Sequence, residues 1–145
     1  MDPSWERFRN NVQQAVAAIV AGDARPYTQC WTAREDATLF GAFGGVVRGQ
    51  KEIAARLAAV AGRYVEGRYT RMDILGEAAT GELAYLVHVE RIESVDHARR
   101  PVVRERRVTH VARREEDGWR IVHQHSDPLV EVQLPPGSRE TTPPV

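Results

Sequence analysis

The chain has 145 residues, the length of one domain, and 42% of them are hydrophobic, as in an ordinary globular protein. Its 20 basic residues balance 20 acidic ones, so the net charge favours neither nucleic acid nor an anionic membrane as a partner. The single cysteine, Cys30, excludes an internal disulfide. The sequence shows neither an apolar signal core at its start nor a long apolar run, so we expect a cytoplasmic protein.

Three helices are predicted in the first part of the chain. Asp2 and Pro3 are typical of a helix start, and Gly22 is placed to end that helix. A shorter helix is predicted over residues 24–31 and an alanine-rich one over residues 50–61. The apolar stripe of the first helix is formed by Trp5, Phe8, Val12, Val16 and Ile19.

The period of the apolar residues changes from 3.6 to 2 after Gly62, which indicates strands. Four segments follow, at about residues 68–77, 82–93, 102–114 and 118–130. Their short links favour an antiparallel meander, and residues 116–118 form a typical hairpin turn.

A short strand and a glycine-rich hairpin are also predicted between residues 38 and 49. Helices followed by strands indicate an α+β fold, in which three helices cover one face of a curved antiparallel sheet. We expect one domain over residues 1–133 and a proline-rich disordered tail over residues 134–145.

Three motifs together resemble those of the SnoaL-like group of the nuclear transport factor 2-like superfamily. They are Arg34–Gly41 with Val47–Gly49, then Arg107–Thr109, and then Gly118–Ser126. The resemblance implies a cone-shaped roll that encloses a pocket between helices and bent sheet. It also implies a homodimer formed through the outer face of the sheet.

The same resemblance argues against the ketosteroid isomerase mechanism. The acidic base of those enzymes falls on Gly41, their tyrosine near Ala15, and their protonated aspartate near Thr109 or His110. A proton shuttle on a steroid needs a carboxylate base and a strong donor pair, and none of these groups is present.

His123 and His125 are candidate site residues on the last strand. Strand alternation places both on one face with Trp119 and Ile121. A histidine there would act as a general base, a ligand anchor or a buried structural group. Two imidazoles on one side also suit a metal, with His88 or Glu90 as a third ligand, but without a dedicated motif we predict no metal and no cofactor.

Arg107 and Thr109 share a face of the third main strand, and the family resemblance turns that face inward. Glu90 and His88 share a face of the preceding strand. An ion pair between Glu90 and Arg107 beneath His125 would either orient a substrate and move a proton or simply fix the strand register. Aromatic residues of the pocket roof and mouth are Tyr27, Trp31, Phe40 and Phe43.

These features lead to a prediction and two alternatives. The pocket binds a small, partly apolar molecule, with His125, Glu90 and Arg107 as catalytic residues. The residues predicted to contact the substrate are Tyr27, Trp31, Phe40, Phe43, His88, Thr109 and His123. The alternatives are a non-catalytic ligand-binding module and a dimeric association module, the latter because Leu83, Tyr85, Val87 and Val89 make a second apolar face.

Overall fold

The computed structural model describes residues 1–137, which form three helices and six strands. The helices are α1 (Pro3–Val20), α2 (Arg25–Gln29) and α3 (Gln50–Ala61). The strands are β1 (Thr38–Gly41), β2 (Gly44–Arg48), β3 (Arg68–Thr80), β4 (Leu83–Val95), β5 (Pro101–Glu115) and β6 (Gly118–Pro128). The α+β prediction is confirmed, although α2 is shorter than expected. Of the predicted tail, residues 134–137 belong to the described part of the chain, and residues 138–145 lie outside it.

The six strands form one mixed sheet in the order β2-β1-β6-β5-β4-β3. The four main strands β3 to β6 pair antiparallel, as predicted, and β1 of the short hairpin joins them by running parallel to β6, with Leu39 opposite Gln124. The segment before β1 already lies along β6, where Cys30 and Thr32 exchange backbone hydrogen bonds with Ile121. The meander argument covers only strands consecutive in sequence, so it could not predict this pairing.

Helix α1 begins and packs as its sequence indicates. The Asp2 side chain caps the helix by accepting a hydrogen bond from the Ser4 backbone at 2.8 Å, and Pro3 follows it. The apolar stripe faces the sheet, with Trp5, Val12 and Ile19 buried. Burial of each such side chain contributes about 1.5–3 kcal/mol.

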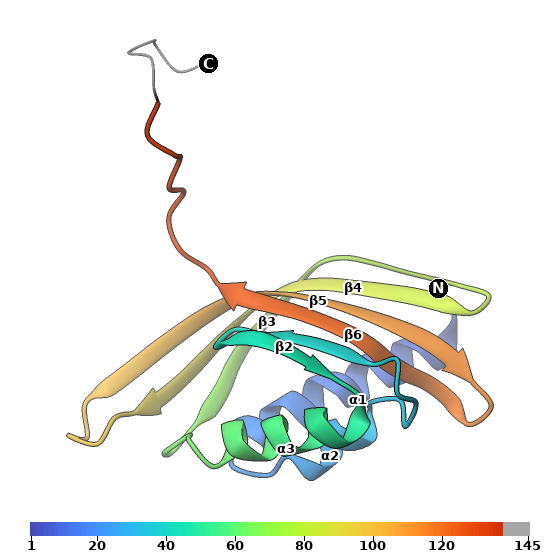
Figure 1. The fold of residues 1–145 in the computed structure, drawn as a ribbon, viewed down its shortest axis with the longest axis horizontal. Coiled ribbons are helices and arrows are strands. Elements are labelled where there is room, and N and C mark those ends of the chain that lie inside the picture. Colours follow the sequence, from blue (N-terminus) through green and yellow to red (C-terminus); the bar gives the residue numbers. More distant parts are fainter. Residues whose placement is uncertain (138–145) are drawn as a thin grey trace.

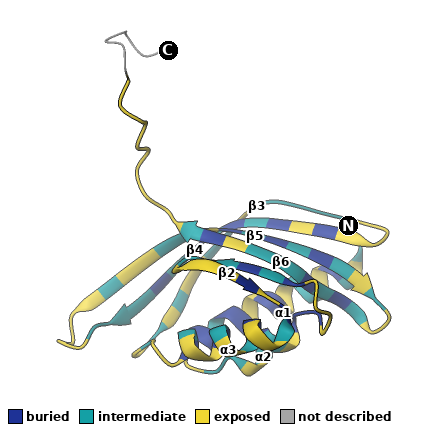
Figure 2. Ribbon diagram, viewed as in Figure 1, coloured by how far each residue is buried: buried dark blue, intermediate teal, exposed yellow. Residues whose placement is uncertain are grey.

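All three helices lie on one side of a strongly curved sheet, so the core lies between them (Figure 1). Register shifts between Tyr69 and Arg71 and between Ile74 and Gly76 mark bulges in β3, and bulges bend strands. Buried and accessible residues alternate along β4, because only one face of the strand meets the helices (Figure 2). The curvature leaves room for a cavity beneath the helices.

The outer face of the sheet carries exposed apolar side chains. Leu83 is 56% exposed and Tyr85 is 45% exposed, both on the face of β4 that points away from the helices. No helix within residues 1–137 is long and apolar enough to span a membrane.

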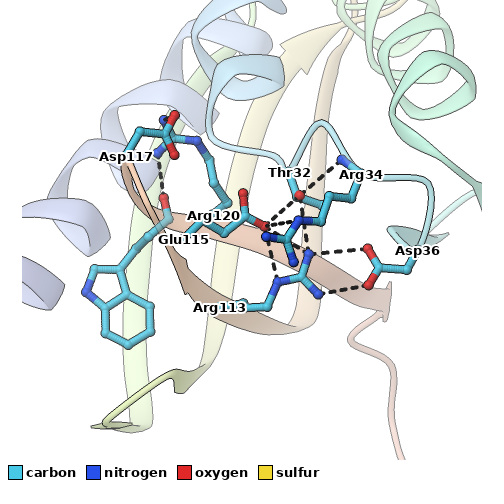
Figure 3. A network of polar contacts seen from close by, with 8 residues as sticks. Thr32, Arg34, Asp36, Arg113, Glu115, Asp117 and Arg120 are labelled. Atoms are coloured by element: carbon cyan, nitrogen blue, oxygen red, sulfur yellow. Dashed lines mark hydrogen bonds and ion pairs between the residues drawn. The ribbon is translucent and has the colours of Figure 1, made fainter.

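A dense polar network fixes the loop before β1 against the far end of β5 (Figure 3). The guanidinium of Arg113 bonds Asp36 at 2.8 Å and Glu115 at 2.9 Å, and Glu115 also accepts a hydrogen bond from the Thr32 hydroxyl at 2.7 Å. Thr32 is fully buried. We call these four residues the Arg113 network.

Candidate functional site

A cavity of about 60 Å³ lies between α1, α3 and the inner face of the sheet. The helices supply an apolar wall, and the strands supply the polar floor. The apolar lining from α1 and α3 is Val16, Ile19, Val20, Leu57 and Val60. The polar and charged lining is Tyr27, Arg56, Tyr64, Glu90, Arg106, His110, Gln124 and Ser126.

Glu90 is a buried carboxylate on the cavity floor. The even-numbered residues of β4 face the helices, so Glu90 and His88 point inward together, as predicted, and are 5% and 1% exposed. Oxygen Oε1 of Glu90 lies 3.1 Å from Nε2 of His88 and accepts a hydrogen bond from the Tyr69 hydroxyl at 3.2 Å. Burial, followed by the charge of Glu90, raises the pKa of Tyr69, so its phenol stays a proton donor.

Arg106 lies beside this carboxylate. Its Nη1 is 3.8 Å from Oε2 of Glu90, which is an ion-pair distance and too long for a hydrogen bond. Its Nη2 donates to the Tyr64 hydroxyl at 2.6 Å, and the guanidinium lies 5.1 Å from the ring centre of Phe43. Phe43 is 59% exposed, so this contact lies at the cavity mouth.

A second chain of hydrogen bonds crosses the floor. The Tyr27 hydroxyl donates to Oε1 of Gln124, whose amide donates to the Ser126 hydroxyl at 3.2 Å. Nε2 of His110 lies 2.6 Å from the Tyr27 oxygen, and because that hydroxyl donates to Gln124, the imidazole is the donor.

The buried groups of this chain are uncharged. Burial, with a contribution from His88, lowers the pKa of His110 to about 3. Burial also raises the pKa of Tyr27 well above its usual value. The rings of His88 and His110 stack at 5.6 Å, and Nδ1 of each is buried without a hydrogen-bond partner among residues 1–137.

His123 and His125 do not point into this cavity, so their predicted orientation is wrong. The pairing of β5 with β6 changes between Val111 opposite His123 and Ala112 opposite Ile121, which leaves Val122 as the extra residue of a bulge. A one-residue bulge moves every later side chain to the other face. His125 is therefore exposed on the outer face.

The outward histidines contact β1 instead. The Thr38 hydroxyl lies 2.7 Å from Nδ1 of His123, and the ring of Phe40 packs beside both histidines. Phe40 is thus also absent from the cavity lining. Within residues 1–137, no three His, Cys, Asp or Glu side chains gather in a group able to hold a metal ion.

Arg107 and Thr109 also differ from their predicted orientation. The inward positions of β5 are the even-numbered ones, including Val108 and His110. Arg107 is exposed and donates two hydrogen bonds of 2.8 Å to Asp127, from Nε to Oδ1 and from Nη2 to Oδ2. The structure therefore does not bring His125, Glu90 and Arg107 together, and of the three only Glu90 lines the cavity.

The predicted aromatic residues divide into two groups. Tyr27 and Phe43 line the cavity, whereas Trp31 is buried behind Tyr27, with its ring centre 6.3 Å from that of Tyr27. Sequence reasoning missed Arg106 and Gln124 as inward residues. The hairpin turn at residues 116–118 sets a register that, continued without a break, would place Val108 opposite His125. The bulge at Val122 shifts that pairing to Ser126, and the sequence carried no signal for the bulge.

A model of the SnoaL-like domain matches residues 9–131. A candidate dehydratase of the NTF2-like family from Streptomyces avermitilis is 19% identical with a TM-score of 0.73, and the match covers 88% of this chain and 95% of that one. A nuclear transport factor 2-like superfamily protein from Salmonella enterica is 17% identical with a TM-score of 0.72, over 92% and 96% of the two chains.

The association domain of C. elegans CaMKII is 18% identical with a TM-score of 0.64, over 85% of this chain and 94% of that one. No curated protein matches the chain. The three structures show the fold alone, whereas the family model spans most of the sequence. The chain belongs to the SnoaL-like family, with the α+β fold of the NTF2-like superfamily.

Proposed function

We propose that this protein binds a small, partly apolar molecule in the cavity and that Glu90 moves a proton on it. The observation that carries the proposal is a carboxylate, 5% exposed, that lines a cavity opposite an apolar wall. A buried carboxylate is costly unless it is paired and hydrogen-bonded, and cavities that join apolar walls to a few polar groups are typical ligand sites.

The two oxygens of Glu90 have different surroundings. Oε1 already meets His88 and Tyr69, which hold the carboxylate in one orientation. Oε2 has only the ion pair with Arg106, so it keeps a lone pair for a ligand proton. A proton leaving a C–H or O–H bond of the ligand would bind Oε2, and Arg106 would stabilise the electron pair left behind.

Proton removal and return at a second atom is the chemistry of isomerases, cyclases and dehydratases. The similar Streptomyces avermitilis protein is named as a candidate dehydratase, which fits this reaction class. Gly41, where the resemblance places the base of ketosteroid isomerases, lines the same cavity but offers no acid. Glu90 reaches the cavity from another strand, so the proposed base is a different one.

Native mass spectrometry of freshly purified protein would identify a co-purified molecule, and turnover of that molecule and of related ones would be measured next. We expect Glu90→Gln to lower turnover by about 100-fold or more while binding persists. Glu116→Gln, in the exposed β5–β6 turn, is the control for the loss of a carboxylate. Unchanged turnover in Glu90→Gln would contradict the role of Glu90.

His125→Ala separates this proposal from a histidine-centred site. His125 lies on the outer face, so we expect turnover within about twofold of the original protein. A large loss of turnover in a folded His125→Ala protein would show that His125 takes part in the reaction and would contradict a site centred on Glu90.

A second candidate function is self-association through the outer sheet face. The exposed side chains of Leu83 and Tyr85 favour it, because a large apolar face outside the core is typical of an interface. One similar structure is an association domain. Light scattering after gel filtration would test it: we expect a dimer that Tyr85→Glu converts to monomer, and a monomeric original protein would contradict it.

A further inference from the structure

Arg106 has more hydrogen-bond donors than the protein uses. A guanidinium carries five N–H donors, and Arg106 donates a hydrogen bond to the neutral hydroxyl of Tyr64. The Arg106 side chain is only 13% exposed, so bulk water does not surround it. A buried arginine without a close anion is unfavourable, and its spare donors line the cavity.

Glu90 does not form a close ion pair with the guanidinium of Arg106. The closest approach of the two groups is 3.8 Å, and the other carboxylate oxygen is occupied by His88 and Tyr69. A paired arginine in the same strand shows the contrast, because Arg107 meets both oxygens of Asp127 at 2.8 Å. The Arg106–Glu90 geometry leaves room for a further anion on the guanidinium.

Two more arginines surround the mouth. Arg56 lines the cavity and donates a hydrogen bond to the backbone oxygen of Gly44 at 3.3 Å. Arg104 lies 5.6 Å from the ring centre of Phe43. Neither Arg56 nor Arg104 makes an ion pair with a carboxylate of residues 1–137. Most other arginines of the sheet that pair with a carboxylate do so at less than 3.5 Å. A mouth of one charge sign attracts ligands of the opposite sign.

The lining therefore holds two arginines, Arg56 and Arg106, against one carboxylate, Glu90. This excess of one positive charge matches a monoanion. The planar fork of a guanidinium fits a carboxylate, with two parallel hydrogen bonds. The apolar wall behind it suits a short hydrocarbon body, and a cavity of about 60 Å³ has room for roughly four to six water-sized groups.

We infer that the ligand is a small monocarboxylate whose head group binds Arg106 and Arg56 at the mouth and whose apolar body lies against α1 and α3. The inference rests on the proposed small-molecule site and narrows its ligand class. It also assigns Arg106 to ligand binding, whereas the family resemblance had turned Arg107 toward the pocket.

Titration calorimetry at pH 7.5 and constant ionic strength tests it with three probes of one chain length: pentanoate, pentanamide and pentan-1-ol. We expect pentanoate to bind at least about tenfold more tightly than pentanamide, because hydrogen bonds to charged groups are the stronger ones. Arg106→Gln should weaken pentanoate binding by about 10- to 100-fold and leave pentanamide binding within about twofold.

Three further variants sharpen the result. Arg56→Gln, at the more open side of the mouth, should weaken pentanoate binding by a smaller factor, about three- to tenfold. Glu90→Gln should strengthen it, because a repelling charge is removed. Lys51→Gln removes one positive charge from the exposed start of α3 and should leave pentanoate binding unchanged. Thermal unfolding would confirm that each variant is folded.

The outcomes separate this inference from the function on which it rests. Equal binding of pentanoate and pentanamide would overturn the assignment of a carboxylate ligand but would leave the proposed small-molecule site intact. Failure of all three probes to bind overturns both. A carboxylate preference that survives in a folded Arg106→Gln protein overturns Arg106 as the anchor.

Discussion

The molecule contains two polar clusters that differ in how completely their charges are paired. In the Arg113 network, one guanidinium bonds two carboxylates, and Glu115 also accepts the hydroxyl of Thr32 (Figure 3). In the cavity cluster, Arg106 bonds a neutral phenol and stands 3.8 Å from Glu90. Both clusters contain an arginine from β5, but Arg106 lies on the inner face of the sheet and Arg113 on the outer face.

This difference separates a structural role from a binding role. A saturated network gains nothing from a ligand, because each strong donor already has its acceptor. An unsaturated cluster keeps donors and acceptors that only another molecule can satisfy. Nδ1 of His110, a residue of the cavity lining, is also buried without a hydrogen-bond partner among residues 1–137. The stability and pH dependence of the protein should therefore respond differently to changes in the two clusters.

The largest expected effect concerns His110 and pH. Its pKa is lowered from 6.5 to about 3 by burial, so it stays neutral in the fold while an unfolded chain takes up a proton below pH 6.5. The unfolded state then binds more protons, and the free energy of unfolding falls as pH falls from about 6.5 toward 3. Between pH 6.5 and 4 the loss should reach about 3 kcal/mol for this one group.

Urea unfolding at a series of pH values measures this loss. His110→Gln should flatten the pH dependence in that window, whereas His97→Gln, in the exposed β4–β5 turn, should leave it unchanged. Equal slopes for the original protein and His110→Gln would show that His110 is protonated in the folded state.

The next largest effect on the free energy of unfolding is expected for Arg113, whose guanidinium is paired with two carboxylates. Arg113→Gln removes the partner of Asp36 and Glu115, and Glu115 is only 12% exposed, so an uncompensated carboxylate remains near Thr32. We expect the free energy of unfolding to fall by about 2 kcal/mol. Urea unfolding at pH 7 measures it, with Arg25→Gln as the control because that arginine pairs with Asp23 on the surface.

The elements of this fold were predictable because local signals agreed. Residues 50–61 form a helix as predicted, and the turn at residues 116–118 joins β5 to β6. Strand alternation placed Glu90 and His88 on one inward face correctly, since β4 pairs with β5 without a break in register. The same inward face carries the buried side chains of Ala84 and Leu86.

The site was less predictable because one extra residue reversed part of a strand. Alternation counted from Trp119 and Ile121 holds only up to the bulge at Val122, after which Gln124 and Ser126 face inward. No residue type marks such a bulge, because Val122 is an ordinary strand former. On β5, both faces carry charged residues, so the pattern alone could not choose Arg106 over Arg107.

A smaller effect is expected for the unsaturated arginine. Arg106→Gln removes a largely buried charge whose nearest anion is 3.8 Å away, so we expect the relief of its desolvation cost to offset the lost contacts with Tyr64 and Phe43 and the long ion pair with Glu90. We expect the free energy of unfolding to change by less than about 1 kcal/mol, under half the effect of Arg113→Gln. Both variants would be measured in one urea series without ligand. A loss as large as that of Arg113→Gln would show that Arg106 is a structural group.

The smallest effect separates the members of the Arg113 network by exposure. The bond from Arg113 lowers the pKa of Asp36, but the side chain of Asp36 is 59% exposed, so water weakens the pair. Asp36→Asn should therefore cost only about 0.5 kcal/mol at pH 7. Because the pKa of Asp36 is lower in the fold, its contribution is present above about pH 4 and disappears as pH falls further.

The difference between the original protein and Asp36→Asn should accordingly shrink as the pH falls below about 4 in the urea series. For Glu115, burial tends to raise the pKa, but the hydrogen bonds from Thr32 and Arg113 outweigh it and lower the pKa. Glu115→Gln should thus cost more than Asp36→Asn, because its partner Thr32 is fully buried. Equal costs would mean that depth does not set the strength of these pairs, and the contrast between the two clusters would then rest on pairing alone.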